Sequence, residues 1–217
     1  NLSNKVNDLS FHLNLKILCF YENETESYKS SLLTHHVRQF TDEGVLFMSS
    51  NYIKPLIASY LNFQNSNKII ELMENYKKGT VFNCQIQPNF SIAKIKKLKF
   101  LNDINISWAL DNRDFLKIKK YLKILTELSF LSGAKEILLP IENKSILCKN
   151  IDQASQEINK LSKQNIEITS VHAMSSCSLS GTNNNIVDLF GKLRNFKNLY
   201  IMDASLLPTN TGQHPQL

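Results

Sequence analysis

The sequence predicts an α+β fold, in which a mostly antiparallel β-sheet carries helices packed on one side. Segments that alternate apolar and polar residues outnumber the segments with apolar residues at helical spacing. Alternating strands suit an antiparallel sheet with one buried face. Both patterns fade near residue 165. We therefore expect a sheet-and-helix domain over residues 1–165 and a sparse segment over residues 166–217.

The first third of the chain is predicted to be mainly strands. Residues 11–21 form a long, partly alternating apolar run and are predicted as a strand. A polar loop over 22–31 separates this run from a short strand within 32–40. Another strand is predicted at 45–49, directly after Gly44.

Two helices are predicted next, and two strands follow them. Asn51 can cap the first helix. The second helix has apolar residues at i, i+3, i+4 and i+7, namely Ile69, Leu72, Met73 and Tyr76. Gly79 is its expected C-cap. The β-branched content of residues 80–87 and 104–110 predicts the two strands.

The best-defined helix is predicted to begin at Asp111. One face of this helix is apolar and carries Phe115, Ile118, Leu122 and Leu125. Gly133 ends it, and residues 135–139 lead into a strand. Asp152 can cap a last helix, whose apolar positions are Ala154, Ile158 and Leu161.

The positive charge of the chain does not point to nucleic acid. The formal net charge is +6, and the densest basic cluster consists of Lys94, Lys96, Lys97 and Lys99. Lysines on alternating residues suit the solvated face of an edge strand. Only Phe90 and Phe100 lie nearby, so the aromatic interleaving of a single-strand binding groove is weak. We expect no nucleic-acid partner.

Several chemistries are excluded by spacing. No two of the six glycines lie within five residues of each other, which eliminates the GxGxxG and GxxxxGK phosphate-binding loops. The four cysteines form no CxxC pair, so neither a zinc site nor any other metal site is expected. No apolar run approaches the length of a membrane span. We expect a cytoplasmic protein without a membrane span.

Two of the five histidines stand out by elimination. His12 lies within a strand pattern, which favours a structural side chain. His35 and His36 are adjacent and would point to opposite faces of an extended segment, so they cannot easily share a metal. His172 and His214 both lie in the sparse C-terminal segment, where functional residues are often found.

The last 50 residues carry a pattern of several parts. Residues 170–179 read SVHAMSSCSL, residues 186–188 read IVD before Gly191, and residues 198–217 read NLYIMDASLLPTNTGQHPQL. This order resembles the C-terminal signature of the glucose–methanol–choline (GMC) oxidoreductases. That signature is H-x-M-G-[ST]-C, then V-V-D and G, then N-L-[YF]-V-x-D-[AG]-S-x-x-P-T, and finally G-x-[NH]-P. The upstream strand and the helix at 114–137 are similar to the family's substrate domain more loosely.

The resemblance implies an FAD enzyme that oxidises the CH–OH group of a small-molecule alcohol. His172 matches the histidine that takes the hydroxyl proton, and His214 matches the second member of that pair. Asp203 and Ala204 match a segment that touches the cofactor. The resemblance also places His214, Pro215 and Gln216 near the flavin ring.

The chemistry of imidazole agrees with this implication. An alcohol releases hydride readily only when its O–H proton is leaving. A neutral imidazole, with a reference pKa of about 6.5, is available as a base near neutral pH. A second imidazole can hold the same oxygen by a hydrogen bond and favour alkoxide character. Residues 172 and 214 are distant in sequence, so only the fold can bring them together.

The sequence departs from the signature in two places. Ser175 and Ser180 stand where the family has glycine, so we expect either a different local turn or an impaired enzyme. The chain begins at Asn1 without an initiator Met, ends soon after the final motif, and lacks the family's FAD-binding half. We therefore expect a fragment of a longer protein, which by itself holds no FAD and has no activity.

Two alternative functions stay open. Some members of the family are hydroxynitrile lyases, which keep FAD without turning it over chemically, and both classes can use the histidine pair. A non-catalytic module that contacts a separate flavoprotein is the other alternative. The departures at Ser175 and Ser180 keep this second alternative open.

Overall fold

The chain divides into two compact units in a computed structural model that describes residues 8–31, 35–50, 52–55, 57, 66–98, 103–142, 146–179 and 186–215. Unit 1 contains Asn1–Leu13, Gln87–Asp114 and Ser170–Leu217, and unit 2 contains Asn14–Ile86 and Phe115–Thr169. The boundary between Thr169 and Ser170 lies close to residue 165, where the helical and strand periodicities of the sequence fade. No periodicity indicates that the two earlier stretches join the C-terminal segment in one unit.

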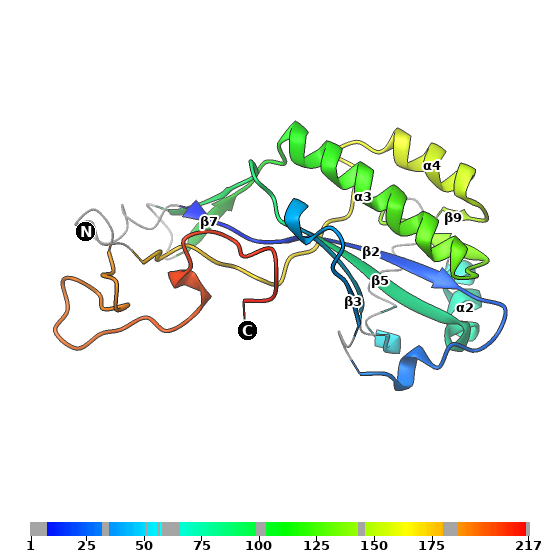
Figure 1. Ribbon diagram of the computed structural model, residues 1–217, viewed down its shortest axis with the longest axis horizontal. Helices are drawn as coiled ribbons and strands as arrows, with labels where there is room; N and C mark the ends of the chain where they lie inside the picture. The colour runs from blue at the N-terminus through cyan, green and yellow to red at the C-terminus, as the bar shows by residue number, and fades with distance from the viewer. Residues whose placement is uncertain are drawn as a thin grey trace. The chain divides into compact units, whose positions relative to one another are not determined.

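A six-stranded sheet is the centre of unit 2, with the order β3-β4-β5-β2-β8-β9. Its strands are β2 (Leu13–Phe20), β3 (His36–Val37), β4 (Val45–Ser49), β5 (Gly79–Ile86), β8 (Glu136–Leu138) and β9 (Leu147–Cys148). The pairs β3–β4, β4–β5, β2–β8 and β8–β9 are antiparallel. The two longest strands, β2 and β5, lie side by side in the middle (Figure 1).

Helices cover this sheet, and the predicted α+β class is confirmed. The long helix α3 (Asn112–Leu131) and the helix α4 (Ile151–Lys160) lie on one face of the sheet (Figure 1). Helix α2 (Ser66–Glu74) packs through Leu72 against Leu18, Phe20 and Val81. Cys19 contacts Ser129 of α3, and successive side chains of a strand point to opposite faces. Helix α2 therefore covers the face opposite to α3.

Both predicted ends of α3 are confirmed. Asp111 caps α3, because its Oδ1 accepts a hydrogen bond of 2.8 Å from the backbone N–H of Arg113. Gly133 follows that helix with φ of +99°, in the left-handed region. The predicted cap of α4 was wrong. Asn150 caps that helix by accepting from the N–H of Gln153 at 2.8 Å, and Asp152 lies in the first turn instead.

The C-cap predicted at Gly79 is also corrected. Helix α2 ends at Glu74, a short 3-10 turn η4 (Tyr76–Lys78) follows, and Gly79 opens β5 with an extended backbone. A Cβ at this position would overlap the hydroxyl of Tyr52, which donates to the carbonyl of Tyr76 at 2.6 Å. The glycine therefore makes room for a buried tyrosine. The helix predicted from Asn51 falls partly outside the described residues.

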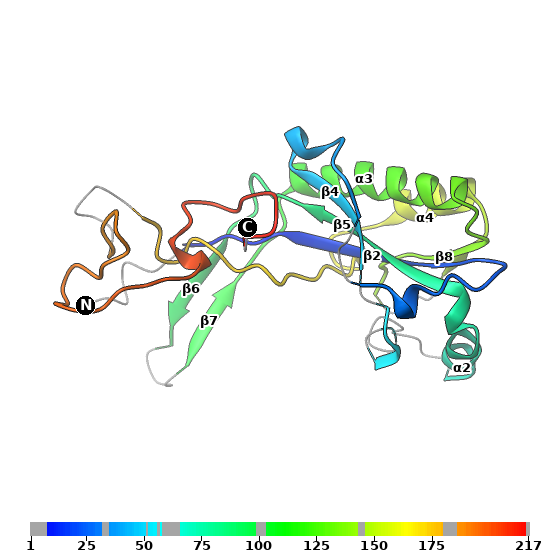
Figure 2. The ribbon, with the colours of Figure 1, turned by 60° about the horizontal axis from the view of Figure 1, so that its bottom comes forward.

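Unit 1 contains a three-stranded antiparallel sheet with the order β1-β6-β7 (Figure 2). Its strands are β1 (Asp8–Leu9), β6 (Ala93–Lys97) and β7 (Ile104–Ser107). Lys94 and Lys96 are exposed on β6, as the alternating pattern predicted. The prediction of an edge strand was wrong, because β6 is the central strand. The two-residue strand β1 leaves too short a pattern to be recognised in the sequence.

The C-terminal segment has little regular structure, as predicted. Isolated bridges join Ser10 to Met174, Val187 to Leu193, and Lys192 to Tyr200. The 3-10 turn η5 (Ala204–Leu206) is the other element in its described part. This segment is therefore held by isolated bridges and a small apolar cluster rather than by long strands.

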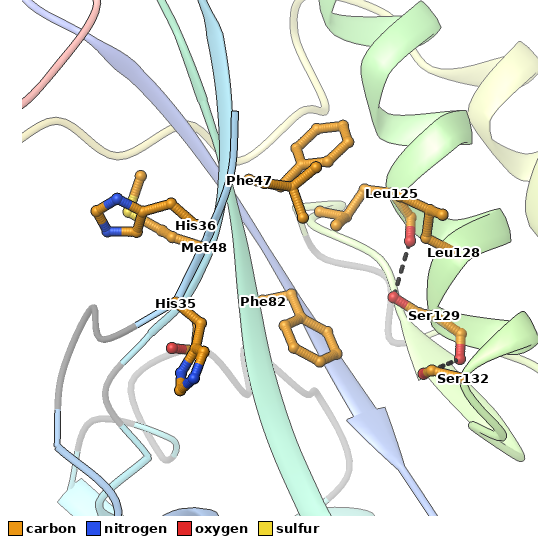
Figure 3. A pocket seen from close by; sticks show the side chains of 11 residues that line it. His35, His36, Phe47, Met48, Phe82, Leu125, Leu128, Ser129 and Ser132 are labelled. Atoms are coloured by element: carbon orange, nitrogen blue, oxygen red, sulfur yellow. Dashed lines mark hydrogen bonds between the residues drawn. The ribbon is translucent and has the colours of Figure 1, made fainter. Parts of the chain in front are cut away.

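A mostly apolar cavity of about 240 Å³ lies within unit 2. Phe47, Phe82, Leu125 and Leu128 point toward one another between the sheet and α3 (Figure 3). His35 and His36 also line the cavity and point in different directions, as an extended segment requires (Figure 3). Among the described residues, no helix has the length and apolar character to cross a membrane.

Candidate active site

Three imidazoles meet in unit 1. Nε2 of His172 lies 3.3 Å from Nδ1 of His214, and the two ring centroids are 5.0 Å apart. Nδ1 of His172 lies 3.0 Å from Nδ1 of His12, with ring centroids 5.2 Å apart. Both nitrogens of His172 are therefore engaged, one by each neighbour. The structure brings together the two histidines that the sequence selected and adds a third.

The position of His172 relative to His12 is fixed by backbone pairing. The N–H of Ser10 donates to the carbonyl of Met174 at 3.0 Å, and the N–H of Met174 donates to the carbonyl of Ser10 at 2.8 Å. His12 lies two residues after Ser10, and His172 lies two residues before Met174. In an antiparallel pair such positions face each other on the same side. The bridge therefore brings the two rings together.

A separate clamp holds the segment that carries His214. The side chain of Gln87 donates to the carbonyl of Asn210 at 2.9 Å. The buried side chain of Asn210 donates to the carbonyl of Pro88 at 3.2 Å. These two bonds tie the chain down four residues before His214.

The loop that forms this clamp is itself held by Asp114. This carboxylate is buried at the start of α3 and accepts from the N–H groups of Asn89, Phe90 and Ser91 at 3.0, 3.0 and 2.7 Å. It also accepts from the Ser91 hydroxyl at 2.6 Å. Four donors on one charged acceptor make a rigid turn. Asp114 therefore supports the clamp, although no pattern in the sequence singled it out.

The predicted cofactor-binding segment lies against the segment that carries His172. Asp203 caps η5 by accepting from the N–H of Ser205 at 2.8 Å, and Asp203 is exposed. The N–H of Cys177 donates to the carbonyl of Ser205 at 2.9 Å, and the N–H of Ser175 approaches the carbonyl of Ala204 at 3.4 Å. Backbone hydrogen bonds therefore join the segment that carries His172 to the segment that carries Asp203 and Ala204. Pro215 is half-buried beside His214.

Two of the residues singled out in the sequence, Gln216 and Ser180, lie outside the described residues. Their roles stay predictions. Among the described residues, no group of three or more His, Cys, Asp or Glu is arranged to hold a metal ion.

Ser175, which stands where the family signature has glycine, has a backbone conformation that favours glycine. Its φ is +75°, in the left-handed region that costs most residues about 1 kcal/mol or more. Its hydroxyl lies 2.5 Å from the hydroxyl of Ser10. A hydrogen bond of this kind contributes about 1 kcal/mol net, which offsets the backbone cost. Ser175 can therefore adopt a conformation that favours glycine, and the expectation of a different turn or an impaired enzyme stays a prediction.

This balance predicts a specific pattern of stabilities. We expect Ser10→Ala to lower the free energy of unfolding by about 1 kcal/mol, because the strained Ser175 then lacks its partner. We expect Ser175→Gly to change it by less than about 0.5 kcal/mol, because relief of strain and loss of the bond cancel. Urea unfolding of both single variants and the double variant measures the coupling. A coupling energy near zero would contradict this interpretation.

Burial lowers the pKa values of His12 and His172. Burial lowers the pKa of His12 to about 4, and the neighbouring His172 and His214 add to the effect. Burial, followed by the charge of His214, also lowers the pKa of His172 below its usual value. Both rings are therefore neutral at neutral pH, and each has one protonated nitrogen and one lone pair.

The lowered pKa of His12 predicts an acid-sensitive fold. The unfolded chain binds a proton at this residue below about pH 6.5, whereas the folded chain does so only near pH 4. Stability therefore falls as pH falls through this window, by about 3 kcal/mol in total from this residue. Comparing urea unfolding of the wild type and His12→Asn at pH 7 and pH 4 measures it. Equal losses of stability in both proteins would contradict the assignment.

The role of His12 could not be inferred from its sequence context. His12 lies within the strand predicted over residues 11–21, and a histidine there is most often structural. Its contact with His172 depends on a bridge between positions separated by more than 160 residues. No local signal reports such a pairing.

Comparisons with known proteins identify the family and support the fold of this chain. The sequence profile of the family described as GMC oxidoreductase matches residues 96–217. An uncharacterized GMC-type oxidoreductase, y4nJ of Sinorhizobium fredii, is 22% identical over 96% of this chain. The crystal structure of pyridoxine 4-oxidase from Mesorbium loti superposes over 98% of the chain with a TM-score of 0.57 and 13% identity, which supports the fold.

The chain spans 41% of the length of each of these two proteins. The match of the family profile covers more than half of the chain and includes every motif on which the resemblance depends. The chain belongs to the GMC oxidoreductase family and represents a C-terminal portion of it.

Proposed function

We propose that this chain is the substrate-side part of an FAD-dependent oxidoreductase that oxidises the CH–OH group of an alcohol. The observation that carries the proposal is the meeting of His172 and His214, whose facing nitrogens are 3.3 Å apart. Family membership supports the reaction class, and the pair supplies a site for the hydroxyl group. His172 and His214 are the proposed catalytic residues.

The facing nitrogens offer what a hydroxyl group needs. A hydroxyl has one proton to donate and lone pairs that accept. With a lone pair on Nε2, His172 can accept the alcohol proton, and with a proton on Nδ1, His214 can donate to the same oxygen. The contact of 3.3 Å between them is long for a hydrogen bond, so it can be exchanged for two shorter bonds to an alcohol.

The lowered pKa of His172 suits a general base. A base must be unprotonated to act, and burial, followed by the charge of His214, lowers the pKa of His172 and so disfavours its protonated form. The rate of alcohol oxidation is therefore expected to fall only when the pH drops below about 6.5. The neighbouring imidazole stabilises the negative charge that develops on the oxygen as the proton leaves.

The described residues fit a flavin beside this pair. No side chain can accept a hydride, and FAD supplies that acceptor when bound. Asp203 is exposed, and Ala204 is held against the His172 segment by the Ser175 and Cys177 backbone contacts. Asp203, Ala204, His214 and Pro215 would hold the cofactor, and Gln216 is proposed with them.

Exposed apolar side chains indicate where a flavin-binding half would pack. Near the site motifs, Val171 is 75% exposed, Phe190 87% and Met202 91%. Further large apolar residues of the same unit are exposed at Leu189, Leu199 and Tyr200. The bridge between Lys192 and Tyr200 brings together the segments that carry most of these residues, and a large exposed apolar surface is characteristic of an interface. We therefore propose the FAD-binding half of the same protein as the partner that covers it.

Rapid mixing tests the proposal. The protein with both halves is loaded with FAD and mixed without oxygen with a panel of primary and secondary alcohols. We expect at least one alcohol to bleach the visible absorbance of the oxidised flavin. Bound flavin that no alcohol bleaches, together with cleavage of a cyanohydrin, would favour a hydroxynitrile lyase. Failure to bind FAD at all would favour a non-catalytic module.

A further inference from the structure

His12 is the third imidazole of the site, and the reaction described above gives it no task. Its side chain is fully buried, and its Nδ1 lies 3.0 Å from Nδ1 of His172. No hydrogen-bond partner of its Nε2 is present among the described residues. The contact with His172 is therefore the hydrogen bond through which His12 can act.

The tautomer of His172 decides whether it can be a base. A neutral imidazole has one N–H, so a lone pair on Nε2 requires the proton on Nδ1. That Nδ1–H must then donate to Nδ1 of His12, which must present a lone pair and therefore carry its own proton on the buried Nε2. The opposite tautomer places a proton on Nε2 of His172, directed at Nδ1 of His214, and leaves no lone pair for an alcohol.

We propose that His12 is a positioning residue, which accepts a hydrogen bond from Nδ1–H of His172 and so keeps the lone pair on the nitrogen that faces the substrate. This inference rests on the proposed function for its consequence in the reaction. The tautomer itself is a property of this chain, and it can be measured without any reaction.

A buried imidazole suits this task because it stays neutral. Burial lowers the pKa of His12 to about 4, and the titratable groups that lower it further are His172 and His214. When His172 gains the alcohol proton at Nε2, it becomes a cation with N–H groups on both nitrogens. The lone pair of His12 then accepts a charge-assisted bond, which is stronger than a neutral one. Because His12 is fully buried and His172 only partly so, a cation is less favourable on His12, and the proton stays on His172.

Removal of the acceptor should reverse the preference. In His12→Leu, a proton on Nδ1 of His172 would face an apolar side chain and lack a partner, whereas a proton on Nε2 would still meet His214. The productive tautomer is then disfavoured by about 10- to 100-fold. In His12→Asn, the amide oxygen occupies a position similar to that of Nδ1 and can accept the same bond. Leucine is therefore the test, and asparagine is the conservative control.

The first measurement is the tautomer. Nitrogen NMR of the full chain, with ¹⁵N-labelled histidine, distinguishes a protonated from an unprotonated ring nitrogen. We expect His172 to be protonated on Nδ1 in the wild type and in His12→Asn, and on Nε2 in His12→Leu. A proton on Nε2 in the wild type, or the same tautomer in His12→Leu, would overturn the proposal.

The second measurement is the rate of alcohol oxidation by the FAD-loaded protein with both halves. We expect kcat to fall about 10- to 100-fold in His12→Leu with KM nearly unchanged, and to recover to within about 10-fold of the wild type in His12→Asn. Equal kcat values in the leucine variant and the wild type would overturn the proposal. A wild type that oxidises no alcohol counts against the proposed function only, because the NMR result decides the role of His12 independently.

Discussion

Replacement of His172 by alanine is expected to lower the rate of flavin reduction by an alcohol about 10²- to 10⁴-fold. The variant loses the lone pair that accepts the hydroxyl proton, so the carbon must release hydride before its oxygen gains alkoxide character. Burial lowers the pKa of this imidazole and keeps it available as a base, which makes its loss costly. Rapid-mixing kinetics at saturating alcohol, followed by the visible absorbance of the flavin, measures the effect.

The matched control for this experiment is His35→Ala. His35 is an exposed histidine of unit 2, and it lines a cavity that contains no residue of the three-imidazole site. We expect this variant to reduce its flavin at nearly the rate of the wild type. Both variants should bind FAD in equal amount, since His172 is not among the proposed flavin contacts. A rate for His172→Ala within about 10-fold of the wild type would show that another group removes the proton.

Replacement of Asp114 by alanine is expected to cost about 3–5 kcal/mol of the free energy of unfolding. Four donors converge on this buried carboxylate, and hydrogen bonds to a charged acceptor contribute about 1.5–3 kcal/mol each net, although bonds that share one acceptor do not add fully. The loop that clamps Asn210 loses its anchor at the same time. Urea unfolding followed by circular dichroism measures the shift of the midpoint.

Asp42→Ala is the control for this effect, because Asp42 is an exposed carboxylate on a short 3-10 turn of unit 2. Its removal is expected to change the stability by less than about 0.5 kcal/mol. If Asp114→Ala loses no more stability than Asp42→Ala, the four hydrogen bonds do not hold the loop together. If His214 depends on that loop, the folded Asp114 variant should also reduce its flavin more slowly than the control.

Local patterns were sufficient for the long elements. The alternation of residues 11–21 predicted β2, and the helical spacing after Asp111 predicted α3 with both of its ends. These elements have many residues in one conformation, so their periodicity can be recognised in the sequence. The histidines of the C-terminal motif were also identified from the sequence, because the parts of the family signature occur there in the same order and with the same spacing.

Long-range features could not be predicted. The strand β1 has two residues, and its pairing with β6 follows from tertiary contacts. The meeting of His12 with His172 depends on one bridge between Ser10 and Met174. The tolerance of serine at position 175 depends on a hydroxyl contributed by the same distant strand. Each of these features joins segments that have no common pattern in the sequence.

A crystal structure of the FAD-loaded protein with a bound, non-oxidisable alcohol analogue tests the central claim most directly. We expect the hydroxyl oxygen to lie within about 3 Å of both Nε2 of His172 and Nδ1 of His214, in place of the direct contact between those nitrogens. An oxygen bound away from either nitrogen, or rings that no longer face each other, would contradict the claim.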